Sequence, residues 1–69
     1  MKKFKHCEII VFDPKWEIPK KHPLKRNEVV VFIGNIPNVP GHCVVAKHNG
    51  KVVWMVHISD FRIATEEEV

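Results

Sequence analysis

The stretch Glu28-Val29-Val30-Val31-Phe32-Ile33-Gly34-Asn35 decides the fold of this chain. Its β-branched and aromatic residues favour a strand, and the Gly-Asn pair that ends the run favours a turn. Two further apolar runs follow at short intervals, over residues 42–47 and 52–58. Brief strands separated by turn residues predict a mostly β protein, a small antiparallel barrel that is closed or nearly closed.

Upstream of this stretch, residues 6–12 predict a first strand and residues 13–27 predict a long loop. The loop holds Pro14, Pro19 and Pro23, and each proline removes a backbone donor and disfavours helix at the residue before it. A connection of this length without regular structure is often functional. We therefore expect a binding surface within residues 14–27.

Downstream, Asn49-Gly50 predicts a type I′ hairpin turn, because both residues tolerate a positive φ angle. Strict alternation along the next strand places the even-numbered side chains of residues 52–58 on one face and the odd-numbered ones on the other. A 3₁₀ turn at residues 59–60 and a closing strand at 61–64, with Phe61 and Ile63 inward, complete about five strands. The aromatic residues expected to pack in the core are Phe12, Phe32, Trp54 and Phe61.

At 69 residues the chain has room for one domain with a modest core. We divide it into residues 1–27 (first strand and Pro/Lys-rich loop), 28–64 (barrel core) and 65–69 (polar tail). No apolar run approaches the roughly 20 residues that span a bilayer, and no signal-peptide hydrophobic region follows the N-terminal lysines. The expected location is the cytoplasm, with no membrane partner.

Charge is unevenly distributed along the chain. Residues 1–28 carry a balance of +4 and residues 29–69 a balance of −1, which gives the net charge of +3. A basic N-terminal third suits nucleic acid, an anionic membrane face or an acidic protein, and it also suits a solvated surface that keeps a small protein soluble. The residues predicted to contact nucleic acid, if that is the ligand, are Lys15, Lys20, Lys21, Lys25 and Arg26.

Cysteine and histidine chemistry offers three alternatives. Cys7 and Cys43 can form one disulfide, but reduced thiols are expected without a secretory signal. Zinc ligation is disfavoured because His6-Cys7 and His42-Cys43 are adjacent pairs, whose side chains point to opposite faces of a strand. A Cys43–His57 nucleophile would need a water-excluding pocket that a chain of this size can hardly build. We therefore predict no catalytic residue, no metal site and no cofactor.

Apolar and histidine side chains in or beside the loops are the candidates for binding a partner. Trp16 lies between charged residues, so its ring either caps an open end of the barrel or anchors a partner. Prolines that hold the loop at residues 36–41 either make it a rigid recognition element or only shape the turn. The predicted partner-binding residues are Trp16, Ile18, Ile36, Val39, His42 and His57.

Over residues 28–64 the chain resembles small SH3-like barrels of the KOW and Tudor kind. The resemblance rests on the spacing of Val29-Val30-Val31-Phe32-Ile33-Gly34, Pro40-Gly41-His42-Cys43-Val44-Val45, Asn49-Gly50-Lys51-Val52-Val53-Trp54 and the residues from His57 to Phe61. It implies an SH3-like antiparallel barrel of about five strands after a long Pro-rich loop. The chain departs from KOW domains at Asn35-Ile36-Pro37, where those often carry a basic Gly-rich loop, so an RNA role is not carried over.

A second resemblance is to small uncharacterised proteins encoded by bacteriophages and bacteria. It rests on Pro37-x-x-Pro40-Gly41-His42-Cys43-Val44-Val45 followed by Gly50-Lys51-Val52-x-Trp54-x-x-His57. It implies a compact accessory protein, and in a phage setting one that acts in the host cytoplasm by binding and modulating a host protein.

Two functions follow from these features. The first is a non-enzymatic protein-binding module, a small regulator whose partner is a host or cellular protein. The second is a nucleic-acid-binding barrel that uses the basic N-terminal third. Because residues 29–33 are apolar on both faces, we expect a monomer or a small homo-oligomer.

Overall fold

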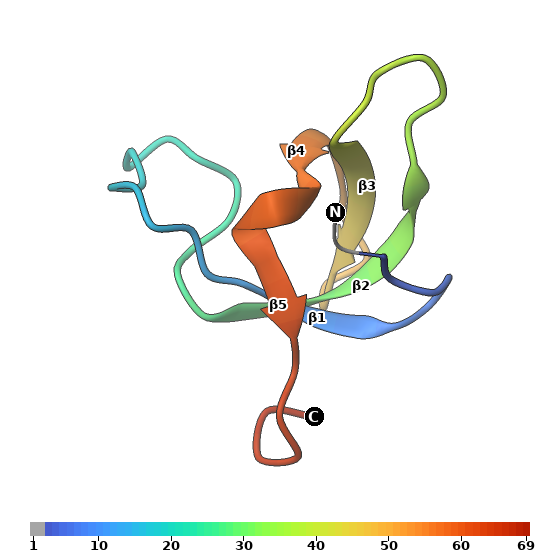
Figure 1. Cartoon of the computed structure of the whole chain (residues 1–69). Helices are drawn as coiled ribbons and strands as arrows, with labels where there is room; N and C mark the ends of the chain where they lie inside the picture. The colour runs from blue at the N-terminus through green and yellow to red at the C-terminus, as the bar shows by residue number, and fades with distance from the viewer. Residues whose placement is uncertain (1–2) are drawn as a thin grey trace.

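Five antiparallel strands form one sheet in the computed structural model, which describes residues 3–69 (Figure 1). The strands are β1 (Ile9–Phe12), β2 (Glu28–Asn35), β3 (His42–Lys47), β4 (Val52–His57) and β5 (Phe61–Ile63). Their order in the sheet is β4-β3-β2-β1-β5, so β4 and β5 are the edge strands. A 3₁₀ turn, η1 (Ile58–Asp60), joins these two edges directly, and no α-helix forms within residues 3–69. The mostly β fold class predicted from the sequence is confirmed.

The core lies on one face of this strongly bent sheet. Its fully buried members include Ile10 and Phe12 from β1, Val30 from β2 and Val45 from β3. Leu24 joins them from the segment before β2 and is only 1% exposed. The radius of gyration of 11.2 Å matches the ~11 Å expected of a compact chain of this length.

Strand β4 contains a β-bulge that the sequence pattern did not predict. Val45 pairs with Val53 and Cys43 pairs with Val56, so the single residue Val44 of β3 opposes two residues of β4, Trp54 and Met55. Met55 is the extra residue, with a φ angle of 61°. The bulge interrupts alternation, and both Val53 and Val56 face the core.

Two expectations about buried side chains are therefore wrong. Trp54 is 68% exposed, because the bulge and the register of Val53 turn it to the outer face of the sheet. Phe61 is buried as expected, but Ile63 is exposed at the far end of the short edge strand β5.

The hairpin turn between β3 and β4 also differs from the prediction. A type I′ turn needs a positive φ angle at both central residues, whereas only Gly50 in this turn has one, at 88°. The Gly50 N–H donates to the carbonyl of Lys47 at 2.9 Å, which encloses His48 and Asn49 in a β-turn. This is the three-residue hairpin loop, a β-turn followed by a left-handed glycine.

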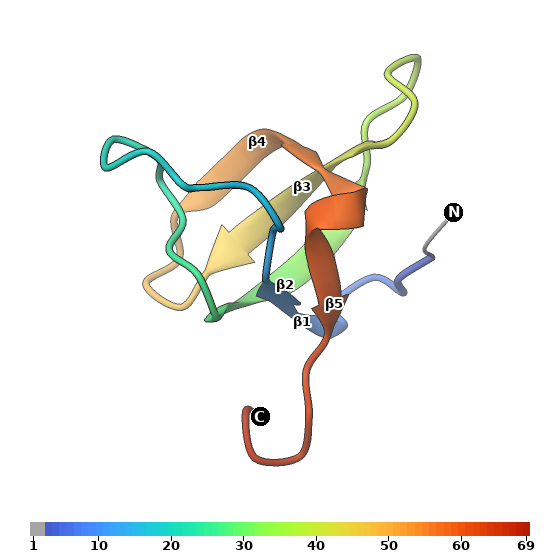
Figure 2. The ribbon, with the colours of Figure 1, turned by 60° about the vertical axis from the view of Figure 1, so that its left-hand side comes forward.

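Residues 13–27 cross from β1 to β2 without a strand or helix. Arg26 holds the two ends of this segment together, because its guanidinium donates to the carbonyls of Pro14 and Trp16. Figures 1 and 2 show that the segment projects from the sheet on one side of β4, while the loop of residues 36–41 projects on the other side.

The turn η1 is tied to both neighbouring connections. The Ile58 N–H donates to the carbonyl of Gly41 at 2.9 Å, and the Asp13 N–H donates to the carbonyl of Asp60 at 2.8 Å. These bonds fix the end of β4 between the two projecting loops. None of the helical turns in residues 3–69 is long and apolar enough to cross a membrane.

Candidate functional site

Trp16 is held in place by its neighbours while one side of its ring stays open. Its Nε1–H donates to Oδ1 of Asp60 at 3.1 Å, and its ring meets Phe12 edge-on with centroids 5.9 Å apart. The ring of His22 lies 5.6 Å away and stacks in turn on Phe12 at 5.1 Å. Trp16 nonetheless remains 41% exposed. The ring is therefore ordered before any ligand arrives.

The open side of Trp16 faces a groove, which we call the Trp16 groove. It has a volume of about 370 Å³. Its lining residues are Phe12, Trp16, His22, Met55, Val56, His57 and Asp60. Met55 reaches the groove because the bulge turns its side chain away from the core, and it is 53% exposed. The groove thus combines two aromatic rings, a flexible thioether, two histidines and one carboxylate, a set suited to apolar contact with polar groups beside it.

A second hollow lies beside the loop of residues 36–41, and we call it the Val39 pocket. It has a volume of about 370 Å³ and is lined by Lys3, Phe4, Asn35, Ile36, Val39, Pro40, Gly41, His42 and Ile58. The loop is shaped by two β-turn bonds: Val39 N–H donates to the Ile36 carbonyl and His42 N–H to the Val39 carbonyl, each at 3.3 Å. Its apolar side chains are therefore presented by a defined backbone.

His42 and His57 join the two hollows. They pair across β3 and β4, with ring centroids 4.2 Å apart. His42 lines the Val39 pocket and His57 lines the Trp16 groove. The ring of His42 is fixed by a 3.0 Å hydrogen bond from Nδ1 to the carbonyl of Pro40. The two hollows thus form one surface that runs across the end of β4.

Five of the six predicted partner-binding residues lie on this surface. Trp16 and His57 line the groove, and Ile36, Val39 and His42 line the pocket. Ile18 lies apart from them, partly buried against the core. The sequence did not indicate Met55, because its place in the groove depends on a bulge that carries no glycine or asparagine to mark it.

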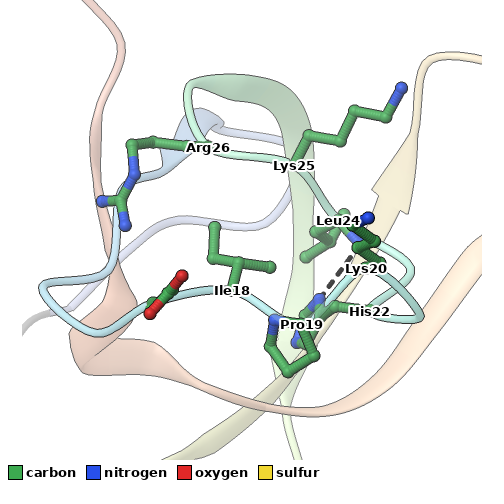
Figure 3. Close-up of a pocket in the computed structure, with 8 residues that line it drawn as sticks. Ile18, Pro19, Lys20, His22, Leu24, Lys25 and Arg26 are labelled. Carbon is green, nitrogen blue, oxygen red and sulfur yellow. Dashed lines mark hydrogen bonds between the residues drawn. The ribbon is translucent and has the colours of Figure 1, made fainter.

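The basic residues of the loop surround a different hollow, of about 440 Å³ (Figure 3). Its apolar residues include Ile18 and Leu24, and its rim carries Lys20, Lys25 and Arg26. Figure 3 shows Lys25 extending away from the hollow. Arg26 is already engaged by loop carbonyls and by Asp13 at 3.6 Å. Lys15 and Lys21 are exposed and do not line it.

The two cysteines are both free thiols in different surroundings. Cys7 is exposed and Cys43 is buried in the core. Burial raises the pKa of the Cys43 thiol to about 11, which keeps it protonated at neutral pH. Within residues 3–69, no three histidine, cysteine or acidic side chains lie close enough to hold a metal ion.

No family model, curated protein or solved structure matched this chain in the comparisons made.

Proposed function

We propose that this protein is a non-enzymatic module that binds a partner protein through the Trp16 groove and the Val39 pocket, and so acts as a small accessory regulator of that partner. The observation that carries the proposal is Trp16, a large ring pinned by Phe12, His22 and Asp60 yet substantially open to solvent. A ring ordered in advance loses little entropy on binding, and aromatic anchors often dominate interface energy.

The proposed architecture is an SH3-like barrel whose outer surface binds the partner protein. The direct connection of the two edge strands through η1 supports closure, since η1 is hydrogen-bonded to the end of β1 and to the loop before β3. The interior is filled by apolar side chains. Cys43, the thiol of the Cys43–His57 nucleophile considered from the sequence, is protonated and buried in that interior, which argues against that nucleophile.

Affinity capture with matched variants tests the proposal. The immobilised wild-type protein is compared with Trp16→Ala, Met55→Gly and the distant exposed variant Glu66→Gln. We expect one defined cellular protein to be retained by the wild type and Glu66→Gln, and lost from both groove variants. The captured protein is then titrated against Trp54→Phe, whose one remaining tryptophan is Trp16, and a saturable change in its fluorescence is expected.

Circular dichroism of each variant separates loss of binding from loss of fold. Equal retention by all folded variants, or a captured protein that leaves Trp16 fluorescence unchanged, would remove the groove as the binding surface.

Nucleic-acid binding is the second candidate, favoured by the exposed lysines of the loop. Among residues 3–69, Lys15, Lys20, Lys21 and Lys25 form no ion pair, whereas Arg26 pairs with Asp13. Fluorescence anisotropy with labelled single-stranded RNA and DNA at rising salt tests this alternative. Binding that weakens steeply with salt and is lost on changing both Lys20 and Lys21 to Ala would support it, because phosphate contacts release counterions.

A further inference from the structure

The rings of His42 and His57 meet where β3 begins and β4 ends. The two residues are partners in the antiparallel register, and their ring centroids are 4.2 Å apart with the ring planes inclined by 46°. His57 is exposed and His42 is half-buried, so solvent reaches the pair. Two imidazoles held this close on an accessible surface can supply two nitrogen ligands to one metal ion.

Hydrogen bonding leaves the Nε2 atom of His42 available as a ligand. Nδ1 of His42 lies 3.0 Å from the carbonyl oxygen of Pro40, and a carbonyl oxygen only accepts hydrogen bonds. The proton of the neutral imidazole is therefore on Nδ1, and the lone pair is on Nε2. Metal-binding histidines characteristically donate their other ring N–H to a carbonyl or carboxylate in this way, which fixes the ring and raises the basicity of the ligand nitrogen.

The other histidine of the Trp16 groove, His22, is not available in the same way. The Leu24 N–H donates to Nδ1 of His22 at 3.1 Å, so in the neutral ring that lone pair is used and Nε2 carries the proton. The ring of His57, by contrast, is engaged by no side-chain hydrogen bond within residues 3–69 and can turn toward His42. The candidate ligands are therefore His42 and His57.

The spacing of the two rings is close to the spacing that a shared metal ion requires. With metal–nitrogen distances of about 2.0–2.1 Å, two imidazoles on one ion place their ring centroids about 4.5–5 Å apart. Starting from 4.2 Å, the rings need to part by less than about 1 Å. The backbone at this end is already fixed, because the Ile58 N–H donates to the Gly41 carbonyl at 2.9 Å. Side-chain rotation alone can therefore complete the geometry.

The surroundings of the pair leave the choice of ion to imidazole chemistry. The charged groups beside it are Asp60, which lines the Trp16 groove with His57, and Lys3, which lines the Val39 pocket with His42. These two charges are of opposite sign. Within residues 3–69 no third histidine, cysteine or acidic side chain joins the pair, so the remaining coordination positions are open to solvent. Imidazole suits copper, nickel and zinc, whereas magnesium and calcium prefer oxygen ligands.

We propose that His42 and His57 bind one divalent transition-metal ion, Cu²⁺ most tightly, with water in the remaining coordination positions. The preference for Cu²⁺ over Ni²⁺ and Zn²⁺ follows the general order of affinities of nitrogen ligands for these ions. The site differs from the adjacent His-Cys pairs disfavoured from the sequence, because its ligands come from two strands and are brought together by the register. It needs no partner protein, so the inference goes beyond the proposed function.

Titration with Cu²⁺ alone tests the site through Trp16, which lines the same groove as His57 and is quenched by a nearby Cu²⁺ ion. The background is Cys7→Ser with Trp54→Phe, which removes the exposed thiol and leaves Trp16 as the sole tryptophan. We expect saturable quenching at one ion per chain. Ni²⁺ and Zn²⁺ should compete less effectively, and Mg²⁺ should not compete. The affinity should fall about tenfold or more from about pH 7.5 to about pH 5.5, because protons compete for the imidazole nitrogens.

Matched variants in the same background identify the ligands. His57→Phe and His42→Phe each keep a ring in the cross-strand pair but remove one ligand nitrogen, and each should weaken Cu²⁺ binding about tenfold or more. His48→Ala, at an exposed histidine of the β3–β4 turn, should leave the affinity unchanged. Circular dichroism shows which variants are folded.

Nuclear magnetic resonance of the wild-type histidines tests the site without any ligand variant. Substoichiometric Cu²⁺ is paramagnetic and should broaden the ring signals of His42 and His57 more strongly than those of His48. Equal broadening of all three, no saturable one-to-one quenching, competition by Mg²⁺, or a folded His57→Phe that binds as tightly as His48→Ala would each overturn the inference. None of these measurements involves a captured protein, so their failure leaves the proposed function to its own test.

Discussion

Met55 adopts a left-handed backbone conformation within a strand, at a φ angle of 61°. Such a conformation costs a residue with a side chain about 1–3 kcal/mol, and the surrounding structure must offset that cost. The residue creates the bulge that brings Val56 to the core, and its own side chain lines the Trp16 groove. One strained residue therefore serves both the core and the candidate site.

The backbone strain at Met55 can be measured by comparing two truncations. Met55→Gly and Met55→Ala both remove the thioether, but glycine accepts a positive φ angle without steric cost. We expect Met55→Gly to be about 1 kcal/mol more stable than Met55→Ala in urea denaturation. At the neighbouring exposed position, Trp54→Gly should instead be less stable than Trp54→Ala by about 0.5–1 kcal/mol. The same order at both positions would contradict a left-handed Met55.

The two thiols are expected to differ in reactivity. Cys7 is exposed, whereas Cys43 is buried and its raised pKa keeps the thiolate population low. A disulfide reagent such as dithionitrobenzoate should label Cys7 in the native protein and Cys43 only after unfolding in guanidinium. Native Cys7→Ser should then remain unlabelled. Labelling of native Cys7→Ser as fast as the unfolded chain would show that Cys43 is accessible.

At the scale of elements, the segment of residues 13–27 belongs to the folded body as much as the strands do. Leu24 is 1% exposed among core residues, and Lys47 donates to the Pro23 carbonyl at 2.8 Å. Together with the Arg26 bonds, these contacts hold the segment that carries Trp16. Because this segment is ordered, the Trp16 groove exists before a partner binds.

Truncating Leu24 tests whether this segment contributes to global stability. Leu24→Ala is expected to lower the free energy of unfolding by about 2–5 kcal/mol, as for other buried leucines. The adjacent exposed variant Lys25→Ala should stay within about 0.5 kcal/mol of the wild type. Urea denaturation followed by circular dichroism measures both. A loss below about 1 kcal/mol for Leu24→Ala would mean that the segment detaches from the core.

The strands were predictable from the sequence, but the faces of β4 were not. The apolar runs at residues 28–33, 42–47 and 52–58 match β2, β3 and β4 closely, because β-branched residues and turn residues alternate clearly there. The bulge at Met55 adds one residue to β4. Because side chains alternate along a strand, one extra residue moves every side chain on one side of the bulge to the opposite face of the sheet from the one predicted. The exposure of Trp54 and the place of Met55 in the Trp16 groove were therefore not predicted. Trp16 was predicted to bind a partner because a tryptophan among charged loop residues is conspicuous in the sequence.

At the scale of the whole molecule, charge is unevenly compensated. The ion pairs of the described chain engage Arg26, Lys47 and Arg62. Arg62 links two distant segments, since it donates to Asp13 at 3.0 Å and to Glu68 at 2.7 Å. The hydrogen bonds from Arg62, and then that from the Thr65 N–H, lower the pKa of Glu68 from 4.5 to about 2.

The acid response of the protein follows from this pairing. A pKa that is lower in the folded than in the unfolded state gives stability that is present above about pH 4.5 and is lost as the pH falls toward 2. Glu68→Gln should therefore be slightly less stable than the wild type at neutral pH, and the difference should vanish near pH 2. Urea denaturation at a series of pH values measures it, with Glu67→Gln as the control that changes little. If the wild type and Glu68→Gln still differ in stability at pH 2, the difference comes from packing of the side chain and not from its charge.

The two loops beside β4 differ in how freely their sequences can change. Residues 13–27 supply Leu24 to the interior and Arg26 to their own backbone, whereas no residue of 36–41 is fully buried. Exchanges should therefore be tolerated at residues 36–40 and at the exposed lysines of 13–27, and should be rejected at Leu24, at Arg26 and at Gly41, whose φ angle is 76°. Sequence changes that create binding to new partners, whether by evolution or by design, would therefore begin in the loop of residues 36–41. The buried and hydrogen-bonded residues of 13–27 would stay the same.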